Sequence, residues 1–501
     1  MLMLRLLCEK DTRQNRFIMR FLKYIVFLVL ILIIPASMAF KTGEILPEVL
    51  AAQNIDLDQI REKGKLSVIT DYNSINYFIY RGQPMGFQYE MLLELADYLH
   101  IELELKANND VNANFESLLK GDFDIIASNL TITNARRELV DFTIPHSQTS
   151  QVLVQRKSLK KASESIRLIR NPNELGGKTV YVRQNSVFSA RLENIEEETG
   201  VDIHIIEVPT ETEQLIKMVA NGEIDYTISD ENVAVVNKTY YPGIDIETTI
   251  SFPQNQAWAV RKGSVKLKKE IDTWLESFRK TAKYAVIYNK YFKSERSAYI
   301  VKSDFYYPET GKICRYDDII KAEAEKIGWD WRLVASLIYQ ESRFNPDITS
   351  WAGAFGIMQL MPRTAHKMGV SKQSSPEAQI RAGIRLIKKL DDRFAEEIID
   401  KHERTKFVLA SYNIGYGHVR DAINLTIKYS GNPTLWDGQV ETYLLKKSEP
   451  KFYNDPVVRN GYCIGNETRN YVRDIMYRYD HYLNIQIVDI AQNMKQRPEI
   501  R

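Results

Sequence analysis

The spacing of apolar residues divides the chain into a front part and a rear part. In the front part, short apolar runs alternate with segments of helical spacing. Leu66 to Thr70 has the composition of a strand, and Tyr89 to Leu99 has the spacing of a helix. This alternation continues to about Phe292 and is typical of an α/β domain. We predict such a domain over residues 65–294, followed by a linker over residues 295–312.

The rear part shows helical spacing almost throughout. Leu333, Val334, Leu337 and Ile338 recur on one face of a segment that begins after Asp330, a residue type that often caps helices. The Asn345-Pro346 pair is expected to end this helix. Further helices are predicted at Tyr316–Ile327, Glu377–Phe394, Thr405–Tyr412 and Glu467–Tyr482. We therefore predict a multidomain protein, with a mainly helical domain over residues 313–501 behind the α/β domain.

The N-terminal residues have the layout of a secretory signal. The apolar run from Phe21 to Ile34 follows Arg20, and the small residues Ala36-Ser37-Met38-Ala39 come after it. The run is short for a membrane span of roughly 20 residues, although a retained anchor stays an alternative. We predict a signal peptide or N-terminal membrane segment over residues 1–39 and a linker over residues 40–64, with the rest outside the cytoplasm.

Charge and cysteine content exclude some classes of function. The chain has 67 basic and 65 acidic residues and a formal net charge of +2, which argues against a nucleic-acid partner. Its three cysteines, Cys8, Cys314 and Cys463, form no metal-ligand motif, so we predict no metal and no cofactor. In an exported protein, Cys314 and Cys463 either pair as a disulfide or stay separate buried thiols.

Glu341 is the residue whose position most clearly suits it for acid–base chemistry. It lies four residues after Leu337 and three after Ile338, so its side chain projects from the apolar side of the helix, near the helix end. Partial burial favours the protonated form of a carboxyl group, and this is how a general acid arises near neutral pH. The ordinary alternative is a glutamate at the water boundary of an amphipathic helix.

Four motifs in order point to an enzyme family. They are Glu341-Ser342, GAFGIMQLMP from Gly353 to Pro362, ASYNIGYG from Ala410 to Gly417, and ETRNYV from Glu467 to Val472. Together they resemble the lytic transglycosylases of the lysozyme superfamily, which cleave bacterial peptidoglycan. The resemblance implies a lysozyme-like fold and Glu341 as the catalytic residue. In that chemistry one carboxyl group acts as acid and then as base, and the C6 hydroxyl of N-acetylmuramic acid closes on C1 to give a 1,6-anhydro end.

The resemblance also implies roles for the residues of these motifs. We expect substrate-binding residues that hydrogen-bond near Glu341, line the glycan groove or brace it: Ser342, Met358, Gln359, Tyr412, Asn413, Glu467 and Tyr471. For some of them an ordinary role is also open, namely packing for Met358 and Tyr471, helix capping for Asn413, and a favourable helix-terminus charge for Glu467.

The front part resembles another family. Gly121-Asp122-Phe123-Asp124-Ile125-Ile126, the run from Asn129 to Arg137, and Gln256-Ala257-Trp258-Ala259-Val260 are similar to segments of the family-3 periplasmic solute-binding proteins. The resemblance implies two lobes that close on a ligand, usually an amino acid. It implies that Arg136 holds a ligand carboxylate with help from Thr131 and Ser186, and that Asp230 takes the ammonium group. The alternative for Arg136 is a surface cation beside Arg137.

The two resemblances together predict an exported peptidoglycan lytic transglycosylase (exo or endo) whose front domain senses or gates. Its partners would be glycan strands and a muropeptide or amino-acid ligand. We expect it in the periplasm, associated with a membrane and peripheral on the outer membrane. The alternative is a solute- or muropeptide-binding sensor whose rear domain only binds peptidoglycan. A water-using muramidase, which leaves reducing ends, is a third possibility.

Overall fold

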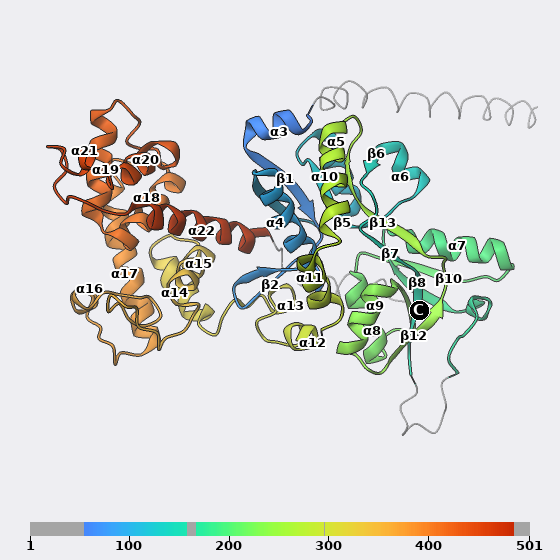
Figure 1. Cartoon of the computed structure of the whole chain (residues 1–501). Coiled ribbons are helices and arrows are strands. Elements are labelled where there is room, and N and C mark those ends of the chain that lie inside the picture. Colours follow the sequence, from blue (N-terminus) through green and yellow to red (C-terminus); the bar gives the residue numbers. More distant parts are fainter. Residues whose placement is uncertain (1–54, 158–166, 295, 485–501) are drawn as a thin grey trace, which may run out of the picture.

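The computed structural model describes residues 55–157, 167–294 and 296–484, and it contains two bodies joined side by side (Figure 1). The predicted signal or anchor at residues 1–39 lies outside the described residues. In the part of the chain that the structure describes, none of the helices has the length and apolarity that a membrane span requires.

The front body consists of two lobes, each built on its own sheet. Lobe 1 has the strand order β4-β1-β5-β13-β6, with β7 also paired to β13. Its strands are β1 (Lys65–Thr70), β4 (Glu102–Ala107), β5 (Ile125–Thr131), β6 (Val140–Phe142), β7 (Ser147–Thr149) and β13 (Gln254–Arg261), and a hairpin is formed by β2 (Phe78–Tyr80) and β3 (Gln83–Met85). Its helices are α3 (Leu57–Lys63), α4 (Phe87–Leu99), α5 (Val111–Lys120), α6 (Asn134–Leu139), α10 (Val265–Phe278) and α11 (Ala282–Phe292).

Lobe 2 has the strand order β10-β9-β11-β8-β12. Its strands are β8 (Gln151–Arg156), β9 (Thr179–Arg183), β10 (His204–Val208), β11 (Tyr226–Asp230) and β12 (Ile244–Thr249), and its helical segments are η2 (Pro172–Leu175), α7 (Val187–Thr199), α8 (Thr212–Asn221) and α9 (Glu231–Tyr240). The chain enters lobe 2 through β7 and β8 and returns to lobe 1 through β13, which pairs antiparallel with β5. The segment Gln256 to Val260, which resembles the solute-binding family, therefore lies in the strand that returns the chain to lobe 1.

Parallel pairing brings the ends of several front-domain strands to one edge. β1 runs parallel to β4, from Lys65 opposite Glu102 to Thr70 opposite Ala107, and it also runs parallel to β5. β9 likewise runs parallel to β10 and β11 in lobe 2. In such sheets ligands bind beyond the carboxyl ends of the strands, so the residues after these ends are candidates for a binding site.

The rear body is helical, as predicted. Its elements are α14 (Asp317–Lys326), α15 (Trp331–Ser342), α16 (Pro362–Lys367), α17 (Pro376–Phe394), α18 (Lys401–Ile414), α19 (Tyr416–Lys428), η3 (Trp436–Val440), α20 (Glu441–Lys446), α21 (Pro450–Tyr453) and α22 (Gly465–Asn484). Cys314 and Cys463 are both buried free thiols in this structure, so the disulfide alternative is wrong for this conformation.

Two segments predicted as linkers contain helices. Residues 40–64 include α3, which begins with a capping box between Asp56 and Gln59. Residues 295–312 include α12 (Arg296–Val301) and α13 (Tyr307–Thr310), where Tyr306 and Tyr307 are buried. Because these aromatic side chains pack between the two bodies, the second segment is a structured joint and not a free connector.

The last helix ties the rear body to lobe 1. α22 packs on α15, α18 and α20 at its beginning and on β3 and β4 at its end, and Figure 1 shows it running between the two bodies. Its Tyr482 hydroxyl donates to the Gly82 carbonyl at 2.6 Å, and its Asn484 amide donates to the Leu105 carbonyl at 2.6 Å. One cluster of buried apolar residues runs from lobe 1 into the rear body and includes Val236 and Tyr240 of α9 in lobe 2, and two further clusters lie within lobe 2. Lobe 1 and the rear body therefore form one packed unit.

Candidate active site and ligand cleft

Helix α15 positions Glu341 by burying the face that precedes it. The Asp330 side chain accepts from the Arg332 backbone N–H at 2.8 Å and caps the helix start. Val334, Leu337 and Ile338 are fully buried. The helix ends at Ser342, because Arg343 and Phe344 both adopt left-handed backbone conformations, with φ of 51° and 63°. The predicted stop at Asn345-Pro346 is therefore too late.

The environment of Glu341 suits a group that alternates between acid and base. Its side chain is half-buried, and its Oε1 accepts a hydrogen bond from the Tyr471 hydroxyl on α22. Burial raises the pKa of Glu341 to about 7, and the Tyr471 hydrogen bond opposes this rise. At neutral pH both the protonated and the ionised forms are therefore populated.

Tyr412 is the second phenol of this site. Burial, together with the charge of Glu341, raises its pKa well above the usual value, so its hydroxyl stays a hydrogen-bond donor. That hydroxyl donates to the Met358 carbonyl at 2.8 Å, which connects α18 to the loop after α15. Tyr412 therefore supports the site through the loop, and its pKa shift shows that it lies near Glu341.

Three predicted substrate-binding side chains have structural roles here. The Ser342 hydroxyl is buried and donates to the Ile357 carbonyl at 2.7 Å. Met358 is fully buried, and its side chain lies where a Cβ at Gly383 would be. The Gln359 amide donates to the Gly356 carbonyl at 2.8 Å and to the Ile348 carbonyl at 3.1 Å. The buried side chains of Ser342 and Met358 therefore take part in packing of the loop, and their contact with substrate stays a prediction.

Asn413, Glu467 and Tyr471 are brought together by the packing of α18 on α22. Asn413 is exposed, and its Oδ1 accepts from the Thr468 hydroxyl at 2.7 Å, so Asn413 joins the two helices. Glu467 is exposed at the start of α22. Tyr471, one helical turn later, is buried against Glu341. The contact between Tyr471 and Glu341 is thus a finding of the structure, and the predicted role of Tyr471 in bracing the glycan groove stays a prediction.

The second candidate site is a cavity of about 130 Å³ between the two lobes, and all four residues predicted for a ligand line it: Thr131, Arg136, Ser186 and Asp230. Arg136 lies on α6, and one of its guanidinium nitrogens donates to the Thr131 carbonyl at 3.0 Å. Ser186 caps α7, and its hydroxyl donates to the Arg183 carbonyl at 2.6 Å. Burial raises the pKa of Asp230 to about 7, against the opposing effects of Gln256 and Arg136.

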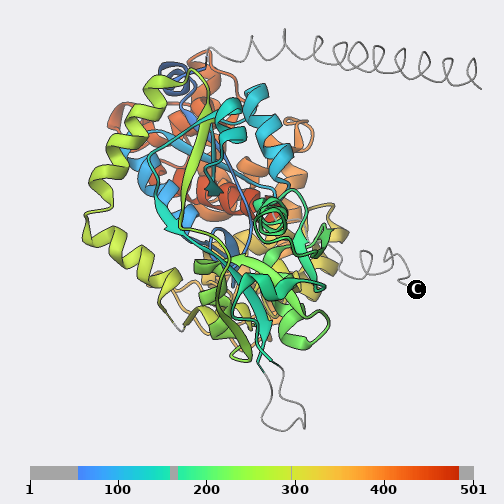
Figure 2. The same cartoon turned by 90° about the vertical axis from the view of Figure 1, so that its right-hand side faces the viewer.

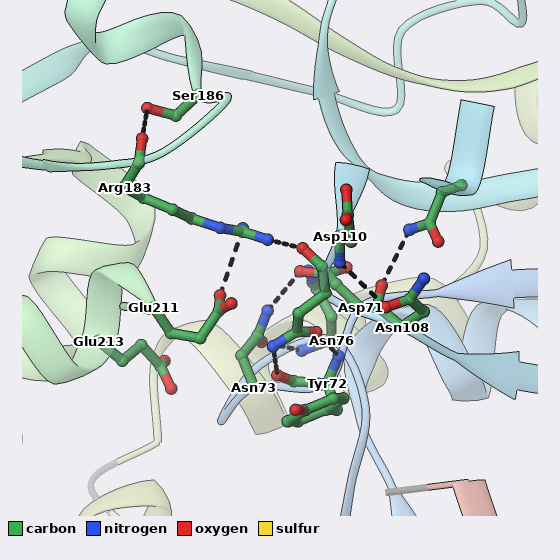
Figure 3. Close-up of polar contacts among 12 residues, drawn as sticks. Asp71, Tyr72, Asn73, Asn76, Asn108, Asp110, Arg183, Ser186, Glu211 and Glu213 are labelled. Carbon is green, nitrogen blue, oxygen red and sulfur yellow. Dashed lines mark hydrogen bonds and ion pairs between the residues drawn. The ribbon is translucent and has the colours of Figure 1, made fainter. Parts of the chain in front are cut away.

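The lobes meet directly at the other end of the cavity. Arg183, at the end of β9, extends across to donate to the Asn109 carbonyl of lobe 1, and it pairs with Glu211 at 3.3 Å (Figure 3). Glu213 accepts from the Ser74 backbone N–H at 3.0 Å and from the Ser74 hydroxyl. The two lobes are thus held together by their own side chains in this structure.

Sequence reasoning missed this end of the cavity. The missed residues include Asp71, Asn73, Asn76, Asn108, Asn109, Asn114, Arg183, Glu211 and Glu213. A signal was present, because Asp71 directly follows β1 and Asn108 directly follows β4, at the shared edge of parallel strands.

Comparison with known proteins covers both bodies. The model of the bacterial extracellular solute-binding proteins, family 3, matches residues 65–186 and 190–294, and that of the transglycosylase SLT domain matches residues 318–433. The membrane-bound lytic murein transglycosylase F of Desulfosudis oleivorans is 37% identical over 424 residues, which are 84% of this chain and 90% of that protein. The protein of the same name from Saccharophagus degradans is 31% identical over 87% of this chain and 86% of its own length.

The chain belongs to the membrane-bound lytic murein transglycosylase F family.

Membership of this family confirms the predicted enzymatic activity. The family matches also confirm that a solute-binding-like domain precedes a transglycosylase domain. The protein is a peptidoglycan lytic transglycosylase with a solute-binding-like front domain and a helical SLT domain, and it is associated with the cell envelope. Among solved structures, a mutant of the arginine-binding protein ArgBP from T. maritima is similar to the front domain, at 24% identity and a TM-score of 0.42, covering 48% of this chain and 100% of that one.

Proposed function

We propose that Glu341 is both the acid and the base of the transglycosylase reaction. The protonated carboxyl group gives its proton to the oxygen between N-acetylmuramic acid and N-acetylglucosamine, and the C1–O bond breaks. The resulting carboxylate removes a proton from the C6 hydroxyl of the same muramic residue, whose oxygen bonds to C1. The carboxyl group is thereby restored without water. The observation that supports this proposal is a half-buried carboxyl with a pKa of about 7.

The residues around Glu341 have different roles in this proposal. Tyr471 orients Glu341 through its hydroxyl, and Tyr412 holds the loop that carries Met358. The exposed Asn413 and Glu467 are the remaining candidates for contact with the glycan, and Gln359 shapes the loop beside them. Burial is the largest cause of the raised pKa of Glu341, which fits a reaction with one carboxyl group.

Mass spectrometry of digested peptidoglycan tests the reaction. The wild-type protein should release products with 1,6-anhydromuramic ends, and Glu341→Gln should lower their release by at least about a hundredfold while binding to sacculi persists. Glu396→Gln, an exposed glutamate of the same domain, is the matched control. Products with reducing ends would show a water-using muramidase instead, and unchanged turnover in Glu341→Gln would exclude Glu341 as the catalytic residue.

For the front cleft we propose an amino-acid or muropeptide ligand. The Arg136 guanidinium would hold a carboxylate with its planar pair of N–H groups, and Asp230 would take an ammonium group. Thr131 and Ser186 would complete the part of the site that binds the ligand's carboxylate and ammonium groups. The observation that supports the proposal is that these four residues, far apart in sequence, line one cavity.

We further propose that the cleft gates the SLT domain through α13. Lobe 1 shares a buried cluster with the rear body, and lobe 2 contributes to this cluster through α9, so ligand-driven closure of lobe 2 would act on both. Lys217 of lobe 2 pairs with Glu309 of α13 at 3.2 Å. Tyr307, two residues before Glu309, hydrogen-bonds Arg332, which pairs with the cap residue Asp330 of α15. A movement of lobe 2 would therefore reach the helix that carries Glu341.

Arg136→Ala tests the gate. Glycan turnover by the wild-type protein should respond to added muropeptides, and this response should be lost in Arg136→Ala. Arg137→Ala, which changes the exposed neighbouring arginine, is the matched control and should keep the response. An unchanged response in Arg136→Ala would contradict the gating proposal.

For the location of the enzyme we propose the periplasm, with peripheral attachment to the outer membrane. Support comes from the apolar run at Phe21 to Ile34 and from the names of the relatives. Cell fractionation with separation of inner and outer membranes tests it, and recovery in the cytosol would contradict it.

A further inference from the structure

The front cleft is lined by more carboxylates than cations. The cavity as a whole is lined by four carboxylates, Asp71, Glu211, Glu213 and Asp230, and by two arginines, Arg136 and Arg183. The negative charge of Asp230 acts on Arg136, and Arg183 forms an ion pair with Glu211. Two carboxylates therefore remain without a paired cation in this part of the chain.

The partners of these two carboxylates are neutral groups. Asp71 accepts from the side-chain amide of Asn73 at 2.6 Å and from that of Asn76 at 3.0 Å. Glu213 accepts from Ser74 and, at 3.4 Å, from the Asn237 amide. Figure 3 shows Glu211, Glu213 and Asp71 gathered around the loop that contains Tyr72 and Asn73. Burial keeps the pKa of Glu213 above its usual value, and burial with the charges of Asp71 and Glu213 raises that of Glu211 to about 7, against the lowering effect of Arg183.

Two of the carboxylates lie at helix N-termini but make no capping hydrogen bond. Glu211 is the N-cap residue of α8 and Asp230 is the N-cap residue of α9, yet neither side chain caps its helix. Aspartate is among the preferred N-cap residues, so this is a local loss that a site for another group explains. Asp230 Oδ1 is buried and has no hydrogen-bond partner in the described residues.

Two further buried groups that line the cavity have acceptor atoms without partners in the described structure. They are Asn114 Oδ1 and Ser128 Oγ, in residues that are 3% and 7% exposed. Buried acceptors without donors are rare in folded proteins because each costs free energy. A ligand group with several N–H donors would satisfy these acceptors.

We infer that the front cleft is built for a ligand with a zwitterionic amino-acid head and a second, distal ammonium group: a diamino carboxylic acid. The head would occupy Arg136 and Asp230, and the distal ammonium would lie among Asp71, Glu213 and the asparagine side chains around them. This inference rests on the proposed ligand-binding role of the cleft and specifies the chemical class of its ligand. An ammonium group has three donors and no acceptor, which matches a pocket of acceptors.

Isothermal titration calorimetry of the full chain with L-lysine and L-norleucine tests the inference. The two have the same head and nearly the same length, but only lysine has the distal ammonium. We expect lysine to bind at least about tenfold more tightly than norleucine, the effect of one charge-assisted hydrogen bond. Equal affinity for the two compounds, or no binding of lysine, would overturn the inference.

Substitution of the cleft carboxylates tests whether these groups cause the preference for lysine over norleucine. Asp71→Asn with Glu213→Gln should reduce the preference for lysine to near one, whereas the control pair Asp122→Asn with Glu197→Gln, which removes the same charge from exposed positions of the two lobes, should keep it. Circular dichroism checks that each variant is folded. A lysine preference that survives in the folded cleft variant would also overturn the inference, and if that variant does not fold, the wild-type comparison of lysine with norleucine decides.

The outcomes separate this inference from the proposals above it. If the wild-type protein binds norleucine as well as lysine and Arg136→Ala abolishes both, the cleft is a ligand site and only its diamino preference is wrong. If lysine is preferred but leaves glycan turnover unchanged, the ligand class stands and the gate is wrong.

Discussion

The Tyr471 hydroxyl donates a hydrogen bond to Glu341 Oε1, although the two residues lie on helices α22 and α15 at opposite ends of the rear domain's sequence. The same helix α22 contacts lobe 1 of the front domain with its last turn. The proposed catalytic carboxyl is therefore oriented by an element that is also part of the interface between the domains. Four predictions follow from this arrangement.

The rate of glycan cleavage should fall as the pH rises through about 7. The first step needs protonated Glu341, and burial raises the pKa of this group to about 7. Above that pH the protonated fraction decreases about tenfold per pH unit. Turnover of purified glycan strands between pH 5 and 9 measures this limb, and a rate that stays constant from pH 6 to 9 would contradict it.

Tyr471→Phe should slow the reaction and move its pH limb upward. The Tyr471 hydrogen bond lowers the pKa of Glu341, so its loss should raise that pKa further. Loss of orientation should reduce kcat about tenfold or more at every pH, as expected for one hydrogen bond to a charged group. Tyr443→Phe, a tyrosine of α20 that stacks on Tyr429, is the control for removing a hydroxyl elsewhere. A pH limb that moves downward in Tyr471→Phe would show that the hydroxyl has another role.

Glu341→Gln should stabilise the fold at high pH. The pKa of Glu341 is about 7 in the folded state and near 4.5 in the unfolded state, so between these values the folded protein binds the extra proton and the stability falls as pH rises. Glutamine does not titrate and avoids this loss. The melting midpoint of Glu341→Gln relative to wild type should therefore be higher at pH 8 than at pH 5. Glu396→Gln should show no such pH-dependent difference, and the same behaviour in both variants would contradict the assignment.

Gly82→Ala should loosen the contact between lobe 1 and the rear domain. Gly82 has a φ of 77°, and a Cβ there would lie 2.8 Å from the Tyr482 hydroxyl and 2.9 Å from Phe344. We expect a loss of about 1–3 kcal/mol in stability from overpacking, in addition to the backbone cost. Gly177→Ala, at a φ of 67° with no atom within 4 Å of the new Cβ, carries only the backbone cost and is the matched control.

Chemical denaturation of the two glycine variants gives the difference between them. In Gly82→Ala we also expect faster proteolytic cleavage between the domains than in Gly177→Ala. Equal stability and equal cleavage rates in the two variants would show that the contact at Gly82 does not hold the domains together.

Local sequence patterns were sufficient to predict much of the fold and the position of Glu341 on its helix. The apolar face of α15 and the position of Glu341 beside it follow from 3.6-residue spacing, and the structure keeps both. The four cleft residues found from motifs, Thr131, Arg136, Ser186 and Asp230, do share one cavity. A motif position does not tell whether a side chain faces a groove or the core, and only the structure shows that Met358 is fully buried.

By itself, the sequence determined which residues can do chemistry, that an α/β part precedes a helical part, and which two families the chain resembles. These depend on short-range spacing and residue type, and a single chain displays them directly. Only the tertiary structure decided that Tyr471 meets Glu341, that Asp71 and Glu211 share a cavity, and that α22 is packed against lobe 1. Such contacts join residues far apart in the chain, and they arise from the burial of apolar faces and the pairing of buried polar groups in the folded state.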